Sequence, residues 1–265
     1  MKYIRKVLTI AGSDSGAGAG IQADLKTFAA LGVYGTSVIT AITAQNTVKV
    51  SAIFELSIDL VAAQIDAVME DIGADALKTG MLANASLIEL IAAKIRAYDL
   101  KNLVVDPVMV AKSGDLLLRK DAIQALCTHL IPMAQVVTPN LPEAQELTGM
   151  KLTRTKEIEE AARRIIAMGA KSVVIKGGHR KGPAIDLFFD GKKIRTLRSP
   201  RMHTRHTHGT GCTFSAAIAA YLAKGKKIED AVAMAKKYIT QAIRRGFAVG
   251  LGHSPVHHFY RFWKN

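Results

Sequence analysis

The alternation of short apolar runs with helical patterns is the feature that most constrains the fold of this chain. Residues 7–11, 76–79 and 103–106 have the length and composition of buried strands, whereas residues 21–31 place apolar side chains at helical spacing. Such alternation is typical of a parallel sheet whose strands are joined by crossover helices. At 265 residues, 49% of them hydrophobic, the chain suits one large α/β domain over residues 1–265.

The other predicted elements continue this order to the end of the chain. Further strands are expected at 34–43, 136–139 and 172–176, and further helices at 58–72, 85–98, 157–168, 213–223 and 228–245. Residues 184–189 and 192–197, joined by Asp190-Gly191, predict a small β-hairpin with a type I′ turn.

The net charge of +14 introduces a competing hypothesis, a basic protein that binds nucleic acid. Aromatic residues make up only 6% of the chain and do not interleave with basic clusters, as base-stacking surfaces require. The densest basic stretch, residues 192–208, leads into a Gly-Thr-Gly turn. Attraction of an anionic small substrate explains this basic stretch as well as nucleic-acid binding does. We therefore expect no nucleic-acid partner.

Composition also bears on the compartment. No apolar run has the length of a membrane span, and the apolar segment at residues 7–11 is shorter than the core of a signal peptide. The two cysteines, Cys127 and Cys212, have neither metal-ligand nor disulfide spacing, which fits a reducing compartment. We expect a cytoplasmic protein without a membrane partner.

The stretch HGTGCTFSAAIAAYLAKG, residues 208–225, predicts an anion site. The turn Gly209-Thr210-Gly211 opens an Ala-rich helix, and the unpaired N–H groups of a helix N-terminus attract phosphate. Cys212 stands beside this turn, where a helix N-terminus lowers the pKa of a thiol. On this stretch alone, a glycine-capped buried helix with a small buried cysteine is an equal alternative.

Functional side chains recur where the predicted strands end. Gln45, Met81, Asp106 and Val108 lie at such ends, and ligands of open parallel sheets bind at the carboxyl ends of strands. Their recurrence is a stronger signal than any one of them. Each also has a structural alternative, since Asp106 before proline suits a turn and Met81 suits a core.

The glycine-rich loop at residues 12–20 follows the first predicted strand. It matches neither the dinucleotide fingerprint nor the P-loop pattern, so neither site is predicted. Its glycines allow a substrate to lie against the backbone, with Asp14 and Asp24 nearby as polar contacts.

Seven motifs follow one another along nearly the whole chain: AGSDSGAGAGIQADLKT, TAQNT, KTGML, DPVMV, TPNLPEA, IKGGH and HGTGCTFSAAIAA. Their order is similar to that in bacterial hydroxymethylpyrimidine/phosphomethylpyrimidine kinases, which belong to the ribokinase-like superfamily and act in thiamine biosynthesis. The chain resembles this family, and the resemblance implies a three-layer α/β/α fold with a central, mostly parallel sheet. It further implies that Mg-ATP phosphorylates hydroxymethylpyrimidine and then its monophosphate, and that the protein is a homodimer.

The resemblance also implies a pyrimidine pocket. Gln45 of TAQNT would hydrogen-bond the pyrimidine. Asp24 of QADLK and Gly12 would line the same pocket, and Met81 and Val108 would form its apolar walls.

On the nucleotide side, the resemblance implies that Asp106 and Glu143, with Asn140, organise Mg2+. Lys176, Asn140 and Thr210 would contact ATP. From the residues alone, Asn140 and Glu143 equally suit a helix N-cap with its first-turn acid, and Lys176 equally suits a solvated strand end.

Cys212 matches the family's catalytic position, and Gly209 to Gly211 match its anion hole. Ribokinase-like sugar kinases have aspartate where this chain has Cys212, so the thiol acts either as a base or as a group that positions the substrate hydroxyl. The nearest rival function is a pyridoxal/pyridoxine kinase of the same fold, which also carries a Gly-x-Gly-Cys turn. Gln45 favours the pyrimidine.

Overall fold

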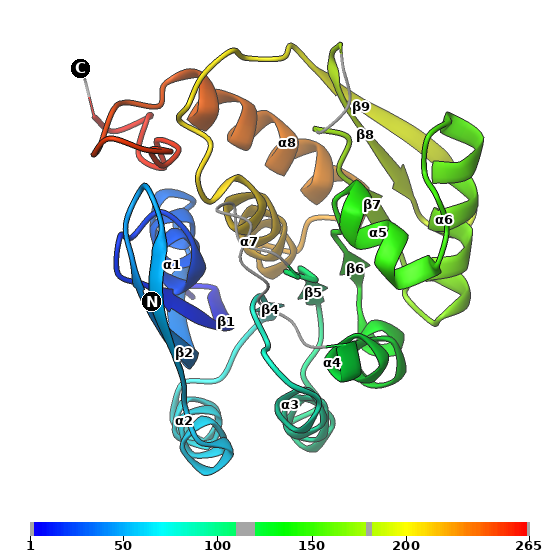
Figure 1. Cartoon of the computed structure of the whole chain (residues 1–265). Coiled ribbons are helices and arrows are strands. Elements are labelled where there is room, and N and C mark those ends of the chain that lie inside the picture. The colour runs from blue at the N-terminus through cyan, green and yellow to red at the C-terminus, as the bar shows by residue number, and fades with distance from the viewer. Residues whose placement is uncertain (1–2, 110–119, 179–181, 264–265) are drawn as a thin grey trace.

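The computed structural model describes residues 3–109, 120–178 and 182–263 of the chain. It contains a nine-stranded sheet with helices on both faces (Figure 1). The expected three-layer α/β/α fold with a mostly parallel sheet is confirmed. Within the described residues, no helix is both long enough and apolar enough to cross a bilayer.

The strands lie in the order β3-β2-β1-β4-β5-β6-β7-β8-β9. Their bounds are β1 Lys6–Asp14, β2 Tyr34–Gln45, β3 Val50–Glu55, β4 Ala76–Thr79, β5 Leu103–Val105, β6 Val136–Val137, β7 Val173–Ile175, β8 Ala184–Phe189 and β9 Ile194–Ser199. The strands from β2 to β7 in this order are parallel, whereas β3, β8 and β9 pair antiparallel at the two edges. The carboxyl ends of the parallel strands therefore meet at one side of the molecule.

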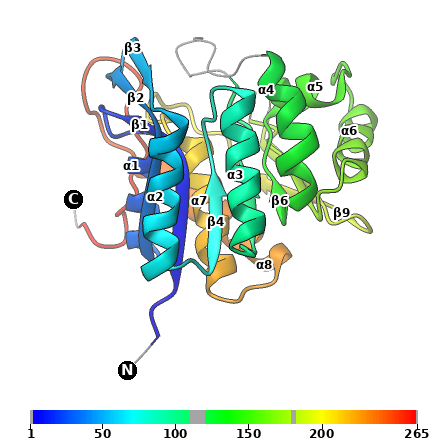
Figure 2. The same cartoon turned by 90° about the horizontal axis from the view of Figure 1, so that it is seen from below.

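The helices form two layers (Figures 1 and 2). One layer consists of α1 Gly20–Ala30, α7 Thr210–Ala223 and α8 Ile228–Arg244. The other consists of α2 Ile58–Asp71, α3 Ala85–Ala97, α4 Lys120–Ala125, α5 Leu141–Thr148 and α6 Thr155–Ala167. A π-helical turn, Leu126–Leu130, and a 3-10 turn, Ile131–Met133, follow α4 and were not predicted.

Alternate residues of each central strand supply the two cores. In β5, Leu103 and Val105 pack on the layer of α2 to α6, whereas Val104 packs on the layer of α1, α7 and α8. All three are buried, which explains why such strands are continuous apolar runs. α7 is itself buried along Thr213 to Ala223, so its alanine-rich sequence lies between the sheet and α8.

Two features of the strands depart from the sequence-based predictions. β3 was not predicted, because its residues are largely exposed and show no apolar period. The hairpin β8–β9 is present, but the prediction of a type I′ turn is wrong. Phe189 pairs with Ile194, so residues 190–193 connect the strands. A type I′ turn needs two central residues with positive φ, and among the described residues of this loop only Gly191 has one.

Candidate active site

A cavity of about 680 Å³ lies where the carboxyl ends of the parallel strands meet the N-terminus of α7. All of the predicted site residues except Asp24 line it: Gly12, Gln45, Met81, Asp106, Val108, Asn140, Glu143, Lys176, Gly209, Thr210, Gly211 and Cys212. These residues come from β1, β2, α5 and α7 and from the ends of β4, β5 and β7. The topology thus brings together side chains that are far apart in the sequence.

The turn before α7 is built as an anion site. Gly209 has a φ of 73°, and a Cβ on it would lie 1.8 Å from the carbonyl oxygen of Gly18. Only glycine therefore fits this position. α7 begins at Thr210, three residues earlier than predicted, so Gly211 and Cys212 belong to the first turn, whose N–H groups have no intrahelical acceptor.

Lys176 and Asp106 stand opposite this turn. The Nζ of Lys176 lies 3.0 Å from Oδ1 of Asp106 and 3.9 Å from Oε2 of Glu143. A Cβ on Gly211 would lie 3.4 Å from that Nζ, so the ammonium lies beside the first turn of α7. Positive charge and N–H donors consequently surround one part of the cavity, and they suit a phosphate group.

The two carboxylates at Lys176 differ in their proton affinity. Burial raises the pKa of Glu143 to about 7, against the attraction of Lys176. Burial acts in the same direction on Asp106, but Lys176, Lys78 and hydrogen bonds outweigh it, so the pKa of Asp106 is lowered. Thr138 Oγ1 and Ser215 Oγ, at 3.1 and 3.2 Å, hold the Asp106 carboxylate in place.

These carboxylates fit a magnesium ion that is shared with a nucleotide. Mg2+ usually keeps several waters and takes one or two protein carboxylates together with substrate phosphates. Asp106 and Glu143 provide that donor set beside the phosphate-binding part of the cavity. Among the described residues, no three His, Cys, Asp or Glu side chains gather as a self-contained metal site. Asn140 and Glu143 also form the capping box of α5, so the structural alternative for them is realised as well.

The expected low pKa of Cys212 is wrong. Burial raises the pKa of its thiol to about 11, and Lys78 and the Gly20 N–H reduce the rise without cancelling it. Cys212 is therefore a neutral thiol at neutral pH. Removal from water outweighs the helix N-terminus at this position.

Asp24 does not line the cavity, which corrects its predicted place. It is fully buried, and its Oδ2 lies 2.8 Å from Nζ of Lys78 and 2.7 Å from Oγ1 of Thr9. Lys78 lines the cavity and is fully buried too, so Asp24 acts on the cavity through this ion pair. Burial would lower the pKa of Lys78, but Asp24 and Asp106 raise it, so the ammonium stays charged.

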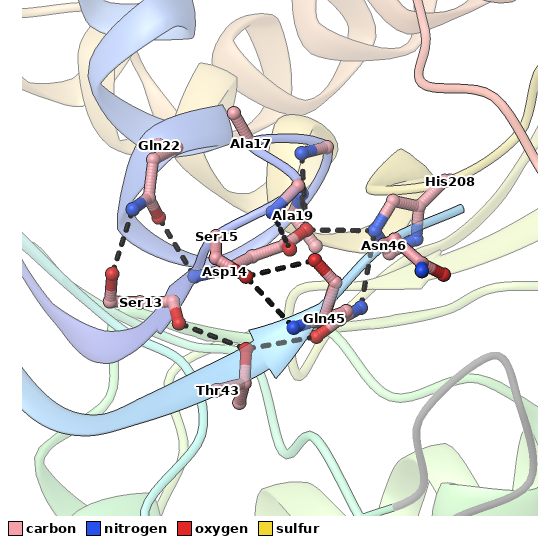
Figure 3. Close-up of polar contacts among 12 residues, drawn as sticks. Ser13, Asp14, Ser15, Ala17, Ala19, Gln22, Thr43, Gln45, Asn46 and His208 are labelled. Carbon is pink, nitrogen blue, oxygen red and sulfur yellow. Dashed lines mark hydrogen bonds and ion pairs between the residues drawn. The ribbon is translucent and has the colours of Figure 1, made fainter. Parts of the chain in front are cut away.

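Asp14, which the sequence suggested as a polar contact, lines the cavity, and so does His208, which was assigned no role from the sequence. Figure 3 shows the buried carboxylate of Asp14 facing the glycine-rich loop and His208 together. The carboxylate accepts N–H bonds from Gly16 and Ala19, both at 2.8 Å, and its Oδ2 lies 2.8 Å from Nε2 of His208. The position of His208, directly before the Gly-Thr-Gly turn, is the sequence signal that could have identified it.

Comparison with known proteins gives a consistent result. The family model described as phosphomethylpyrimidine kinase matches residues 14–257. The hydroxymethylpyrimidine/phosphomethylpyrimidine kinase of Rhizobium meliloti is 54% identical over 262 residues, which are 97% of this chain and 98% of that protein. The thiamine biosynthesis bifunctional protein ThiED of Geobacter sulfurreducens is 53% identical over 95% of this chain, and the match spans 52% of its length.

Solved structures agree with the fold. The pyridoxal kinase of Bacillus subtilis, in an ADP complex, superposes with a TM-score of 0.90 at 44% identity, covering 97% of this chain and 98% of that one. The phosphomethylpyrimidine kinase of Clostridium difficile 630 superposes with a TM-score of 0.81 at 46% identity, covering 90% and 99%. These comparisons favour a kinase over the nucleic-acid-binding alternative.

Proposed function

Because the chain belongs to the phosphomethylpyrimidine kinase family and is therefore a phosphotransferase, we propose that it phosphorylates hydroxymethylpyrimidine and then the resulting monophosphate. The donor is ATP, and the product serves thiamine biosynthesis. The observation that carries this proposal is the cavity itself, in which the first turn of α7 faces Lys176 and Asp106. Phosphoryl transfer depends on positioning and charge neutralisation, which this arrangement supplies.

We assign the phosphate groups of ATP to the part of the cavity between the first turn of α7 and Lys176. The N–H groups of Gly211 and Cys212 receive the transferring phosphoryl group, while Lys176 adds a positive charge from the opposite wall. Such donors stabilise charge that develops on the phosphoryl oxygens in the transition state. Thr210 and Asn140, which also line the cavity, contact the nucleotide.

We assign Mg2+ to Asp106 and Glu143. When bound, the ion neutralises negative charge on the phosphate oxygens. Asp106 is ionised and fixed by Thr138 and Ser215, so it is the permanent ligand. Lys176 holds both carboxylates at the same place, at 3.0 and 3.9 Å.

We assign Cys212 to position the substrate hydroxyl. Its thiol is neutral at neutral pH, so deprotonation of the hydroxyl by a standing thiolate is not the starting step. A loose transition state for phosphoryl transfer needs the attacking oxygen in line more than it needs early removal of its proton. A contact of this kind contributes on the order of 3 kcal/mol to the transition state, or roughly a hundredfold in rate.

We assign the pyrimidine ring to the part of the cavity next to β1 and β2. The amide of Gln45 provides polar recognition, and Met81 and Val108 provide apolar walls. Gly12 allows close packing there, because a Cβ on it would already lie 3.2 Å from Sδ of Met81.

A coupled assay of ADP production tests the proposed function. Purified protein is given hydroxymethylpyrimidine, its monophosphate or pyridoxal, and we expect both pyrimidines to be better substrates than pyridoxal. Cys212→Ala should reduce turnover about a hundredfold, whereas Cys127→Ala, a change outside the cavity, should not reduce it. A strong preference for pyridoxal would favour the alternative function, which the structural similarity to the Bacillus subtilis pyridoxal kinase motivates. Unchanged turnover of Cys212→Ala would refute its assignment.

We also propose that the protein is a cytoplasmic homodimer. ATP is supplied in the cytoplasm, and the edge strand β3 with its neighbours exposes apolar side chains that a second copy would cover. Phe54 is 70% exposed, Val48 61% and Ile42 47%. Light scattering should give twice the chain mass for the wild type and the single mass for Phe54→Glu, and a monomeric wild type would refute the dimer.

A further inference from the structure

The glycine-rich loop and the turn before α7 are interlocked around His208. A Cβ on Gly18 would lie 2.1 Å from the His208 ring, and a Cβ on Gly209 would lie 1.8 Å from the Gly18 carbonyl oxygen. The loop therefore contacts both the imidazole and the turn at Gly18. Neither segment can shift without displacing the other, because glycine is what allows both approaches.

The backbone of His208 is fixed by the C-terminal segment. The N–H of His208 donates to the carbonyl of Ser254 at 3.0 Å, and the N–H of Val256 donates to the carbonyl of His208 at 3.3 Å. The same segment bonds the chain after β2, since the N–H of His253 donates to the carbonyl of Thr47 at 2.8 Å. The imidazole consequently projects into the cavity wall from a backbone held on both edges.

Asp14 determines the hydrogen-bonding role of the imidazole. Burial would raise the pKa of the Asp14 carboxyl, but bonds from His208, Ala19 and Gly16 lower it overall, so the group is ionised at neutral pH. An ionised carboxylate only accepts hydrogen bonds, so Nε2 of His208 carries a hydrogen and donates it. This nitrogen cannot also accept from Gln45, whose Nε2 lies 3.4 Å away.

The side chain of Gln45 is held at its other end (Figure 3). Its Oε1 lies 3.1 Å from Oγ1 of Thr43, whose hydroxyl also lies 3.0 Å from the carbonyl oxygen of Ser13. The hydroxyl of Ser15 bonds both the backbone N–H and the carbonyl of Gln45 at 2.8 Å. The oxygen end of the amide lies at Thr43 and the nitrogen end at the imidazole. The amide hydrogens then have no acceptor in the imidazole and are available to a ligand that offers acceptors, as the ring nitrogens of a pyrimidine do.

We propose that His208, oriented by Asp14, is a positioning residue that holds Gln45 and the glycine-rich loop in place against the phosphate-binding turn. One imidazole contacts both the residue that reads the ring and the loop that packs on Gly209. The distance between the bound ring and the transferring phosphoryl group therefore depends on His208. This inference rests on the proposed function, and it adds a residue that acts through others without touching the reacting atoms.

Steady-state kinetics of His208→Leu test the inference, with His203→Leu as the matched control because His203 is exposed in the same segment. Loss of a hydrogen bond to a charged group should lower kcat/KM for hydroxymethylpyrimidine by about ten- to a hundredfold. The KM for ATP should change by less than about twofold, because the ammonium of Lys176 is untouched. His208→Gln, which can place an amide N–H near the Nε2 position, should restore most of the activity.

A double-mutant cycle separates positioning from a structural effect. If His208 acts through Gln45, Gln45→Ala combined with His208→Leu should lose little more than the worse single variant. If the loss of activity in the double variant equals the product of the two single losses, the proposal is overturned. Equal increases in KM for both substrates, or a failure of His208→Gln to restore activity, would also overturn it. If His208→Leu does not fold by circular dichroism, Asp14→Asn replaces it and should show the same selective loss. The turnover of hydroxymethylpyrimidine by the wild type tests the proposed function. The ratio of kcat/KM between each variant and the wild type tests the role of His208.

Discussion

The ionisation of Cys212 provides the sharpest test of the chemistry proposed here. Burial raises the pKa of its thiol to about 11. At pH 7 only about one thiol in ten thousand would be ionised, compared with roughly three in a hundred for a free cysteine with a pKa near 8.5. Since the thiolate is the form that reacts with an alkylating agent, Cys212 should react with iodoacetamide roughly two to three orders of magnitude more slowly than free cysteine at pH 7.

The assay follows alkylation by intact mass from pH 7 upward in a Cys127→Ala background, so that Cys212 is the single cysteine. The rate should rise about tenfold per pH unit up to the highest pH at which the protein stays folded. Cys212→Ala in the same background provides the blank. An inflection at or below pH 8 would refute the argument, because it would mean that the helix N-terminus and Lys78 outweigh burial.

Three further changes have outcomes that follow from the structure. Lys78→Met leaves a fully buried carboxylate without its cation, so it should lower the free energy of unfolding by about 3–5 kcal/mol in urea titrations; a loss below about 1 kcal/mol would contradict the ion pair. Glu143 has a pKa of about 7 in the folded protein, compared with an ordinary value of 4.5. Between these two pH values the folded protein keeps the proton of Glu143 while the unfolded chain has lost it. The free energy of unfolding therefore falls as the pH rises through this range, by up to about 3 kcal/mol. Glu143→Gln should remove this fall, and parallel pH profiles for the two proteins would count against it. Gly209→Ala should abolish activity and destabilise the fold, because its Cβ would meet the Gly18 oxygen at 1.8 Å, whereas Gly225→Ala, with a φ of 75° and open space, should show only the smaller backbone effect. Equal melting temperatures for these two variants would show that the close approach is not required.

The central sheet was predictable because its strands are buried on both faces. Such strands must be apolar throughout, and β4 was predicted with the bounds that the structure shows, Ala76–Thr79. β3 left no comparable signal, since it lies at an edge and exposes Ile53 and Phe54. The turn of the β8–β9 hairpin was mispredicted for another reason: Asp-Gly fits several turns, and the pairing register, which only the folded strands determine, selects among them.

The candidate site was predictable to the extent that residue position follows from topology. Asn140 and Lys176 follow β6 and β7, and parallel strands bring such residues to one edge. The pKa values and the burial of these side chains do not follow from the topology. The thiol of Cys212 and the carboxylate of Asp24 depend on how much protein covers them, and on the position of Lys78, which no spacing in the sequence indicates.

The contact between Asp14 and His208 joins residues that are 194 positions apart, and the bond between Thr47 and Gly252 spans 205. During synthesis, the first strands therefore leave the ribosome long before the segments that complete their cavity. Contacts of such high sequence separation form late and slowly, because the intervening chain must be ordered first. Fragments released before the last quarter of the chain lack His208, the first turn of α7 and the C-terminal segment together. A fragment that ends before His208 therefore lacks part of the cavity wall, and we expect it neither to bind nor to turn over substrate.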